Sequence, residues 1–156
     1  MSKNELPQMV SYFDEDVRVS LEMPIFWNAG KNADFPLLLV APKKEDYHSN
    51  LGFERVQFAI ESPQAFEASI RQTKADQARD YEGYEMVGEE RWLQDNRPTY
   101  WQQYTWSDGH HLFVQVLVLF VLDDQTVMQV HGATLVGMVD EVIPIFRHVI
   151  ESLRFA

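Results

Sequence analysis

Apolar residues gather in three consecutive stretches between residues 97 and 133, the most regular part of the chain. Residues 99–107 are rich in Thr, Tyr and Trp, which suit a pleated, half-buried strand. Residues 111–122 contain a nearly unbroken apolar run (LFVQVLVLFVL), which is too short to span a membrane and typical of a central strand buried on both faces. Residues 126–133 are the third stretch. The pattern predicts three antiparallel strands joined by short turns.

The first of these turns contains Asp108-Gly109, a pair that favours a two-residue hairpin loop. Such a loop sets the register of the two strands. Because side chains alternate between the faces of a strand, it also places eight side chains on one face, and a slip of one residue would exchange the faces. The predicted facing pairs are Trp106 with His111, Tyr104 with Phe113, Gln102 with Gln115, and Tyr100 with Leu117.

The rest of the chain predicts two helices and further strands. Ser62-Pro63 is typical of a helix start, because Ser caps free N–H groups and Pro has none to lose, and this helix is expected to end near Tyr81. The clearest helical spacing covers residues 139–153. Its Pro144 belongs in the first turn, so we expect a start at about Asp140. Strands are predicted at residues 17–23, 36–41, 55–60 and 85–93.

This order of elements predicts an α+β fold, because tight turns between consecutive strands give an antiparallel sheet that the helices must cover. We expect about six or seven strands flanked by two helices. Residues 1–14 are expected to be a flexible lead-in, and residues 15–156 to form one domain. Residues 26–28 are expected to begin a loop.

Composition excludes several classes of protein. With 46% hydrophobic residues and 20 aromatic side chains among 156 residues, the chain is not disordered. A formal net charge of -11 argues against binding nucleic acid or anionic membranes and favours a basic partner. There is no cysteine, so no disulfide or thiolate site exists. The first residues contain no apolar stretch of signal-peptide length, so we expect a cytoplasmic protein without membrane insertion.

The sequence contains no motif that carries known chemistry. The seven glycines are scattered, and no G-x-S-x-G elbow is present. His110 and His111 are adjacent at the predicted turn, and Glu89 and Glu90 are adjacent on a predicted strand. Adjacent side chains on a strand point to opposite faces, so neither pair is expected to converge on one metal ion or one substrate. We therefore expect no catalytic residues, no metal and no cofactor, and predict that the protein is not an enzyme.

A few marker residues nevertheless resemble a known fold. Spread over residues 15–155, they are LEMP at 21–24 before Trp27, NRP at 96–98, YTW at 104–106, Gln115 in the long strand, and IESLRF at 150–155. Together they resemble the PsbP/Mog-like fold, in which an antiparallel sheet has a helix on either side. The resemblance implies this fold more strongly than any activity.

Proteins of this fold bind other proteins or serve as accessory subunits. They include a photosystem II subunit, a factor that releases nucleotide from the Ran GTPase, lipoproteins of the LpqN type, and Eag chaperones of type VI secretion effectors. The Eag chaperones are cytoplasmic and of similar length. Their expected Asp-Gln pair after the first Trp is absent here, since Trp27 is followed by Asn28-Ala29-Gly30.

The predicted partner-binding site lies on one face of the three-stranded region: Tyr100, Gln102, Tyr104, Phe113 and Gln115. A concave face of this kind would accept an apolar helix, with the amides satisfying its polar groups, since a buried glutamine is costly unless paired. Two alternatives stay open: the helix over residues 139–153 buries this face, or the glutamines pair with each other.

We therefore predict a non-catalytic protein-binding module, in its narrowest form a cytoplasmic chaperone or adaptor that holds a hydrophobic segment of a secreted effector. Such a module would expose an apolar sheet face, and we also consider a homodimer. The alternatives are a small-molecule-binding protein with a pocket between sheet and helix, and an accessory subunit of a larger complex.

Overall fold

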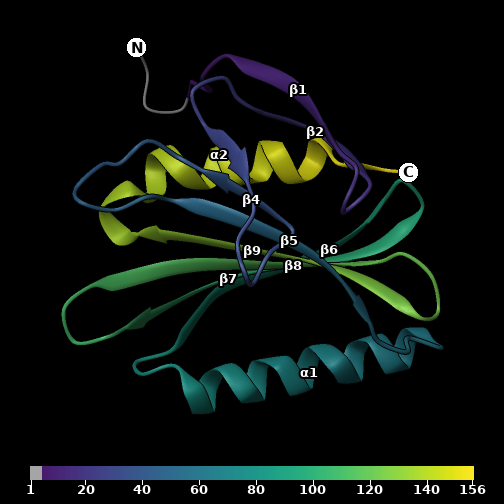
Figure 1. The fold of residues 1–156 in the computed structure, drawn as a ribbon. Helices are drawn as coiled ribbons and strands as arrows, with labels where there is room; N and C mark the ends of the chain where they lie inside the picture. The colour runs from purple at the N-terminus through teal and green to yellow at the C-terminus, as the bar shows by residue number, and fades with distance from the viewer. Residues whose placement is uncertain (1–4) are drawn as a thin grey trace.

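The computed structural model describes residues 5–156, which form two sheets and two long helices (Figure 1). The elements in chain order are β1 (Met9–Asp14), β2 (Val19–Pro24), β3 (Asn28–Gly30), β4 (Leu37–Val40), β5 (Asn50–Gln57), α1 (Pro63–Asp80), β6 (Glu85–Gln94), β7 (Arg97–Ser107), β8 (Leu112–Val121), β9 (Thr126–Leu135), the 3-10 helix η1 (Val136–Met138), α2 (Val139–Ser152) and β10 (Arg154–Phe155).

The larger sheet has seven antiparallel strands in the order β3-β4-β5-β9-β8-β7-β6. Figure 1 shows α1 on one side of this sheet and α2 on the other, with β1 and β2 on the side of α2. The apolar strand β8 is interior in the sheet, as its sequence predicts. The predicted α+β fold, with an antiparallel sheet flanked by two helices, is confirmed.

The predicted hairpin register is wrong by two residues. Ser107 pairs with Leu112, so the loop has four residues, and Trp106 therefore faces Phe113. The Asp108 carboxylate explains the longer loop, because its Oδ1 accepts the backbone N–H groups of both residues 110 and 111, at 2.8 and 2.7 Å. A shift of two residues preserves the alternation of side chains, so the predicted division between the two faces holds.

A second, three-stranded sheet has the order β1-β2-β10, and it overturns part of the predicted lead-in. Residues 9–14 are not a flexible lead-in: they form β1, which pairs along its whole length with β2. Residues 1–4 lie outside the described part. β1 escapes prediction because an edge strand with both faces partly exposed shows no clear alternation.

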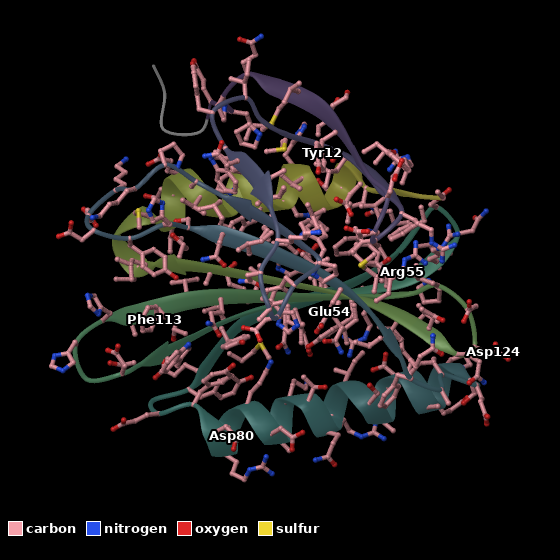
Figure 2. The ribbon with its side chains drawn as sticks, in the orientation of Figure 1. Tyr12, Glu54, Arg55, Asp80, Phe113 and Asp124 are labelled. Atoms are coloured by element: carbon pink, nitrogen blue, oxygen red, sulfur yellow. The ribbon has the colours of Figure 1, made fainter. Side chains whose placement is uncertain are left out.

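The turn between β1 and β2 is tied to the large sheet by a side chain of β5. Arg55 donates from Nε to the carbonyl of Val17 at 2.7 Å and from Nη2 to that of Arg18 at 3.2 Å (Figure 2). Burial and the nearby Arg18 lower the pKa of Arg55. The guanidinium satisfies two carbonyls of a turn in which Arg18 has a positive φ of 55°.

Both helices begin close to their predicted starts. Ser62 caps α1, since its Oγ accepts the N–H of Ala65 at 3.0 Å, and Pro63 is the first helical residue. α2 begins at Val139, directly after η1, so Pro144 lies in its second turn rather than its first. At the other end of α2, Gln94 Nε2 donates to the carbonyls of residues 150 and 153, at 2.7 and 3.1 Å.

The sheet separates two apolar cores of unequal size. The larger core joins α2, β2 and one face of the sheet, whereas the smaller core lies beneath α1. On the α2 side, the side chains of Val116 and Phe146 pack directly against the backbone of Gly132 on β9. A Cβ at this position would lie 2.5 Å from Val116 Cγ2 and 2.9 Å from Phe146 Cε2. The smaller core consists of Ile60, Phe66, Ile70, Tyr100, Leu117, Leu119 and Val127.

Charged side chains hold the edge strand β6 to both helices. On the α1 side, Arg91 donates to Glu67 through two nitrogens, at 2.9 and 2.8 Å. On the α2 side, Arg147 Nη1 lies 2.6 Å from Glu90 Oε2 while its guanidinium covers the Trp92 ring at 4.6 Å. Charges on an edge strand also discourage pairing with another sheet edge.

We expect Gly132→Ala to destabilise the fold by about 1–3 kcal/mol, because the added methyl group overpacks the larger core. Urea unfolding of the variant and the parent measures this change. Gly30→Ala is the matched control, since a Cβ at Gly30 meets nothing within 4 Å. Equal losses in the two variants would contradict the assigned packing.

We also expect the Glu90–Arg147 pair to stabilise the fold in a pH-dependent way. The hydrogen bond from Arg147 lowers the pKa of Glu90 below its ordinary value of 4.5, so the contribution is present above pH 4.5 and disappears as pH falls through the folded-state pKa. A double-mutant cycle with Glu90→Gln and Arg147→Gln should give a coupling of less than about 1 kcal/mol at pH 7, since Glu90 is half exposed. A coupling that persists undiminished at pH 3 would contradict this assignment.

Candidate functional site

Four of the five predicted partner-binding residues, Tyr100, Gln102, Tyr104 and Gln115, lie on the face of the sheet that α1 covers. Phe113 shares this face by alternation along β8, but it packs at the margin of the larger core, with its ring 6.2 Å from that of Tyr47. Tyr100, Gln102 and Tyr104 are at most 4% exposed, whereas Phe113 and Gln115 are half-buried. The alternative that residues 139–153 bury this face is wrong, because α2 packs on the opposite face. A partner could touch the three buried side chains only if α1 moved.

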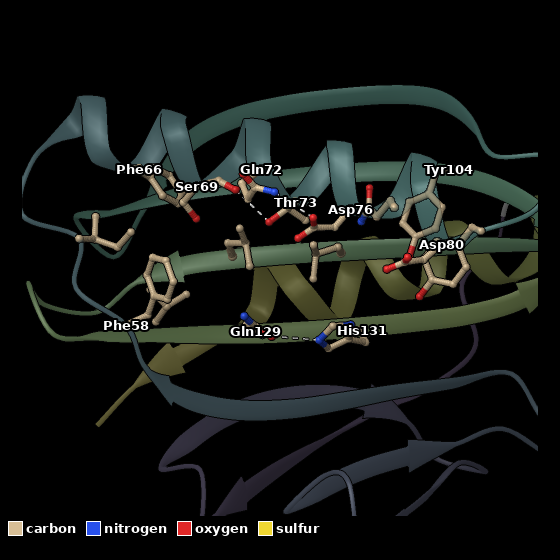
Figure 3. Close-up of a pocket in the computed structure, with 16 residues that line it drawn as sticks. Phe58, Phe66, Ser69, Gln72, Thr73, Asp76, Asp80, Tyr104, Gln129 and His131 are labelled. Atoms are coloured by element: carbon tan, nitrogen blue, oxygen red, sulfur yellow. Dashed lines mark hydrogen bonds between the residues drawn. The ribbon is translucent and has the colours of Figure 1, made fainter.

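A cleft of about 450 Å³ remains beside α1, between that helix, strands β7, β8 and β9, and the segment that follows β5; we call it the α1 cleft (Figure 3). Its floor is apolar and its rim on α1 is polar. The floor residues have low exposure, which limits what a ligand could contact without a shift of α1. The floor includes Ile60, Phe66, Leu117, Leu119 and Val127, and the rim includes Ser69, Gln72, Thr73, Asp76 and Asp80.

His131 stands on the sheet side of the α1 cleft (Figure 3). Its ring packs against that of Phe35 at a centroid distance of 5.5 Å, and its Nε2 lies 3.2 Å from Gln129 Oε1 and 3.8 Å from Glu54 Oε1. Burial lowers the pKa of His131, so the imidazole is neutral at pH 7. It can therefore offer hydrogen bonds to a ligand, but little charge.

The carboxylates on the α1 rim are already engaged. Arg79 Nε donates to Asp80 at 2.9 Å, and Asp76 lies 3.3 Å from Arg79 and accepts from Gln72 at 2.9 Å. The hydrogen bond from Arg79 lowers the pKa of Asp80. The α1 cleft thus combines an apolar floor with a rim whose charges pair among themselves, which suits binding better than acid–base chemistry.

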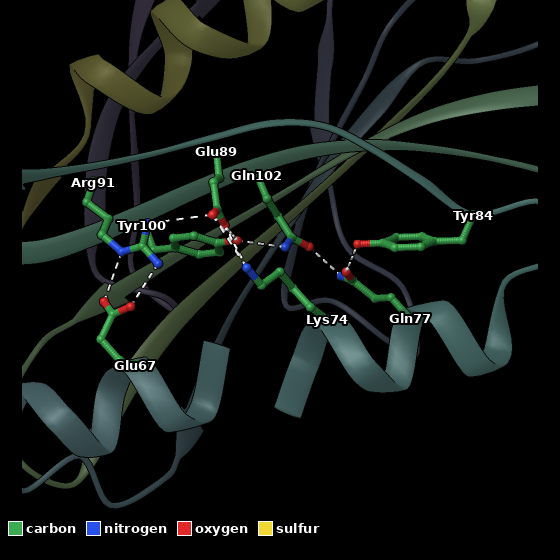
Figure 4. Close-up of polar contacts among 8 residues, drawn as sticks. All are labelled: Glu67, Lys74, Gln77, Tyr84, Glu89, Arg91, Tyr100 and Gln102. Carbon is green, nitrogen blue, oxygen red and sulfur yellow. Dashed lines mark hydrogen bonds and ion pairs between the residues drawn. The ribbon is translucent and has the colours of Figure 1, made fainter. Parts of the chain in front are cut away.

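A chain of polar contacts fixes α1 onto β6 and β7 (Figure 4). Lys74 lies 3.2 Å from Glu89, whose carboxylate accepts the Tyr100 hydroxyl at 2.6 Å. That hydrogen bond lowers the pKa of Glu89, and burial raises the pKa of Tyr100. These polar contacts continue from Tyr100 to Gln102, which donates to the Tyr100 hydroxyl at 2.9 Å. Gln102 in turn accepts from Gln77 on α1, and Gln77 accepts from the Tyr84 hydroxyl just after α1.

These contacts give both Gln102 and Gln115 hydrogen-bond partners within the protein, so neither side chain needs an external ligand. Gln102 accepts from Gln77 and donates to Tyr100, while Gln115 accepts the Tyr104 hydroxyl at 2.8 Å. The shifted register separates Gln102 from Gln115, so the alternative that they pair with each other is wrong. The hydrogen-bonding need that suggested an open ligand face is met inside the chain.

An exposed apolar surface lies elsewhere, on the α2 side of the molecule. Phe26 is 77% exposed, the highest value among the large apolar side chains of residues 5–156. The segments that carry Ile25 and Leu6 lie side by side, since the Ile25 N–H donates at 2.9 Å to the carbonyl of Gln8, two residues after Leu6. We define the Phe26 surface as Phe26 and three exposed apolar residues that are each next in sequence to a residue lining the groove described below: Leu6, 41% exposed, Ile25, 43%, and Val136, 51%.

A groove of about 710 Å³ runs beside the Phe26 surface. Its apolar part is anchored in the larger core, since Trp27 packs edge-on against Phe146 at 6.2 Å between ring centroids. The base is therefore a rigid part of the fold. The groove is lined by Glu5, Pro7, Gln8, Pro24, Phe26, Trp27, Pro42, Lys44, Gly137, Asp140, Glu141 and Ile145.

A tight turn explains why Phe26 points outward. The Trp27 N–H donates to the carbonyl of Pro24 at 3.0 Å, which reverses the chain directly after β2. This turn buries Trp27 and leaves Phe26 in solvent. Sequence reasoning placed Phe26 in a loop and gave it no role. The available signal was Ile25-Phe26 itself, two large apolar residues in a turn that polar residues usually occupy.

Residues 5–156 contain neither a metal-binding cluster nor a membrane-crossing helix. No group of three or more His, Asp or Glu side chains there has the arrangement to hold a metal ion. No helix in that range is long and apolar enough to cross a membrane.

No protein-family model matches this chain, and no curated protein matches it. Several solved structures do. LpqN of Mycobacterium tuberculosis, involved in cell envelope biogenesis, is 12% identical, with a TM-score of 0.72 over 96% of this chain and 91% of LpqN. Cyanobacterial PsbP from Synechocystis is 13% identical, with a TM-score of 0.65 over 97% and 95% of the two chains.

The Saccharomyces cerevisiae Ran-binding protein Mog1p is also similar, at 9% identity and a TM-score of 0.63 over 96% of each chain. Identities this low carry an argument about fold alone. The agreement extends over nearly the whole chain in each case. The protein therefore has the PsbP/Mog-like fold, as its marker residues predict.

Proposed function

We propose that this protein is a non-catalytic module that binds a segment of another protein at the Phe26 surface. One observation carries the proposal: Phe26, which is 77% exposed, lines a groove of about 710 Å³ together with the buried side chains of Trp27 and Ile145. Scattered exposed apolar residues are ordinary, but an exposed aromatic ring at a groove with an apolar base is typical of interaction sites.

The groove provides an apolar place in which a side chain of a partner protein can be buried. An apolar side chain of the partner would enter between Phe26 and the base formed by Trp27 and Ile145, both almost completely buried. Filling the groove would remove the Phe26 ring from water, and burial of a side chain of this size contributes about 1.5–3 kcal/mol. Aromatic anchors beside a rigid pocket dominate the affinity of many interfaces.

The chaperone or adaptor that holds a hydrophobic effector segment is a narrower form of this proposal, and the accessory subunit is another. Both require a stable surface that captures an apolar segment of a second protein. The description of Mog1p as Ran-binding supports protein binding as a use of this fold. Direct contact of a partner with Tyr100, Gln102, Tyr104, Phe113 or Gln115 stays a prediction, and for the three buried residues Tyr100, Gln102 and Tyr104 it requires movement of α1.

A photo-crosslinking amino acid in place of Phe26, in cells that normally make the protein, should yield a discrete cross-linked product. The same label at Phe13, which is 54% exposed on β1, is the matched control and should not give that product. Phe26→Asp should then weaken binding of the identified partner by at least about tenfold. It should leave the free energy of unfolding within about 0.5 kcal/mol of the parent, because the ring is exposed. Identical products from both labelled positions, or none from either, would contradict the proposal.

The α1 cleft supports a second candidate, the binding of a small molecule. Its volume of about 450 Å³ falls in the range of ligand pockets, and polar rim groups stand over an apolar floor. A compound bound there should raise the melting temperature of the parent but not of Thr73→Trp, whose larger side chain would fill the cleft. Thr73 is half-buried on the rim, and circular dichroism checks that the variant is folded. Compounds that stabilise both proteins equally would show binding elsewhere.

A further inference from the structure

We infer that the segment bound at the Phe26 surface is basic as well as apolar, with a Lys or Arg next to its apolar anchor. This inference rests on the proposed docking at Phe26 and adds the chemical class of the partner. It is carried by the charges that surround the groove, which are strongly unbalanced.

Among residues 5–156, three carboxylates and one basic residue line the groove. The carboxylates are those of Glu5, Asp140 and Glu141, and the basic residue is Lys44. A fourth, Glu45, stands close by, because its Oε2 would lie 3.6 Å from a Cβ at Gly137. The groove therefore carries an excess of negative charge directly beside exposed apolar side chains.

The basic residue that lines the groove within the described part of the chain already shows how a basic group is held. Lys44 Nζ lies 2.6 Å from Glu141 Oε2, and this ion pair joins the loop after β4 to the first turn of α2. The hydrogen bond to Glu141 raises the pKa of Lys44. Both side chains are more than half exposed, so the pair is weakly held and a partner's cation can exchange with it.

The α2 helix accounts for only part of this acidity. Asp140 and Glu141 lie in its first turn, where carboxylates favour the positive end of the helix dipole. Glu5 precedes β1 and Glu45 follows β4, so neither belongs to a helix start. Carboxylates from three separate segments converge on the same apolar groove, which the needs of one helix do not explain.

Charge also disfavours the other occupants of an apolar surface. A second copy would bring an identical acidic rim and a net charge of -11 to the interface, so a homodimer through this face sets like charges together. An anionic membrane surface would be repelled for the same reason. A basic protein segment is the occupant that satisfies both the apolar and the acidic parts of the surface.

Arginine fits this surface better than lysine. Its guanidinium can stack on the open face of the Phe26 ring while it donates to a carboxylate of the rim. Within residues 5–156 three arginines adopt this arrangement: Arg91 over Tyr100 at 5.0 Å, Arg147 over Trp92 at 4.6 Å and Arg97 over Phe155 at 4.9 Å.

Fluorescein-labelled probe peptides test the inference without knowledge of the natural partner. Three peptides of about twelve residues alternate Leu with Arg, with Glu or with Ser, so that only charge differs. Fluorescence anisotropy gives their dissociation constants at about 50 mM and 300 mM salt, since screening of exposed charges is the expected signature. We expect the Leu/Arg peptide to bind at least about tenfold more tightly than the Leu/Glu peptide, and less tightly at high salt.

Variants locate the binding. Glu5→Gln with Glu141→Gln should weaken the Leu/Arg peptide by about fivefold, the effect of roughly one exposed ion pair. Glu85→Gln with Asp124→Asn is the matched control, because it changes the net charge equally at two exposed carboxylates outside the groove. Phe26→Ser and, separately, Ile25→Ser should weaken every peptide that binds the groove.

Each outcome distinguishes this inference from the docking proposal. If the groove double variant and the control double variant weakened binding of the Leu/Arg peptide equally, the peptide would be attracted to net charge alone. That result would overturn the inference. Equal binding of the Leu/Arg and Leu/Glu peptides, lost in Phe26→Ser, would overturn the basic partner and keep the docking surface. If no peptide binds the parent more tightly than Phe26→Ser, the inference fails, and cross-linking at Phe26 decides the docking proposal separately.

Discussion

The structure depends on one constraint: strand β8 is apolar on both faces, so the chain must cover its central sheet from both sides. Each side is covered differently. α2 and the three-stranded sheet bury one face in a large apolar core that reaches from Val19 to Phe146. α1 covers the other face with a small apolar core and a chain of hydrogen bonds that starts at Lys74. A buried polar chain of this kind specifies position as well as contributing stability, because every member must keep its partner.

This division determines which surfaces remain for function. The face with Tyr100 and Gln102 has its hydrogen bonds satisfied and its apolar surface covered by α1. Among the large apolar side chains of residues 5–156 that stay exposed, Phe26 is the most exposed, and it lies with Ile25 in the turn that follows β2. The same turn that directs Trp27 inward directs Phe26 outward. The candidate docking surface is therefore a by-product of how the larger core is closed, positioned on a rigid base.

Much of the fold could be predicted from residue patterns, and much of the candidate site could not. The apolar run of β8, the Ser62 cap and the spacing of α2 are local signals, and each element forms near its predicted place. The edge strand β1 carries no such signal because neither of its faces is fully buried. Phe26 could not be identified as exposed, since its exposure depends on the turn geometry and on segments distant in sequence that line the same groove, such as those of Lys44 and Ile145.

Residue patterns alone specify three features. The order of strands and helices predicts the α+β class, and the apolar run of β8 predicts its interior position in the sheet. A period of two residues along a strand predicts which side chains share a face. The tertiary structure decided the four-residue hairpin loop, through the side chain of Asp108, and it decided that α1 rather than α2 covers the face with Tyr100. It also decided that Gln102 is paired inside the chain and that Phe26 is left in solvent. The reason is physical: periodicity sets the direction of a side chain relative to its own strand, whereas burial depends on which distant element packs above it.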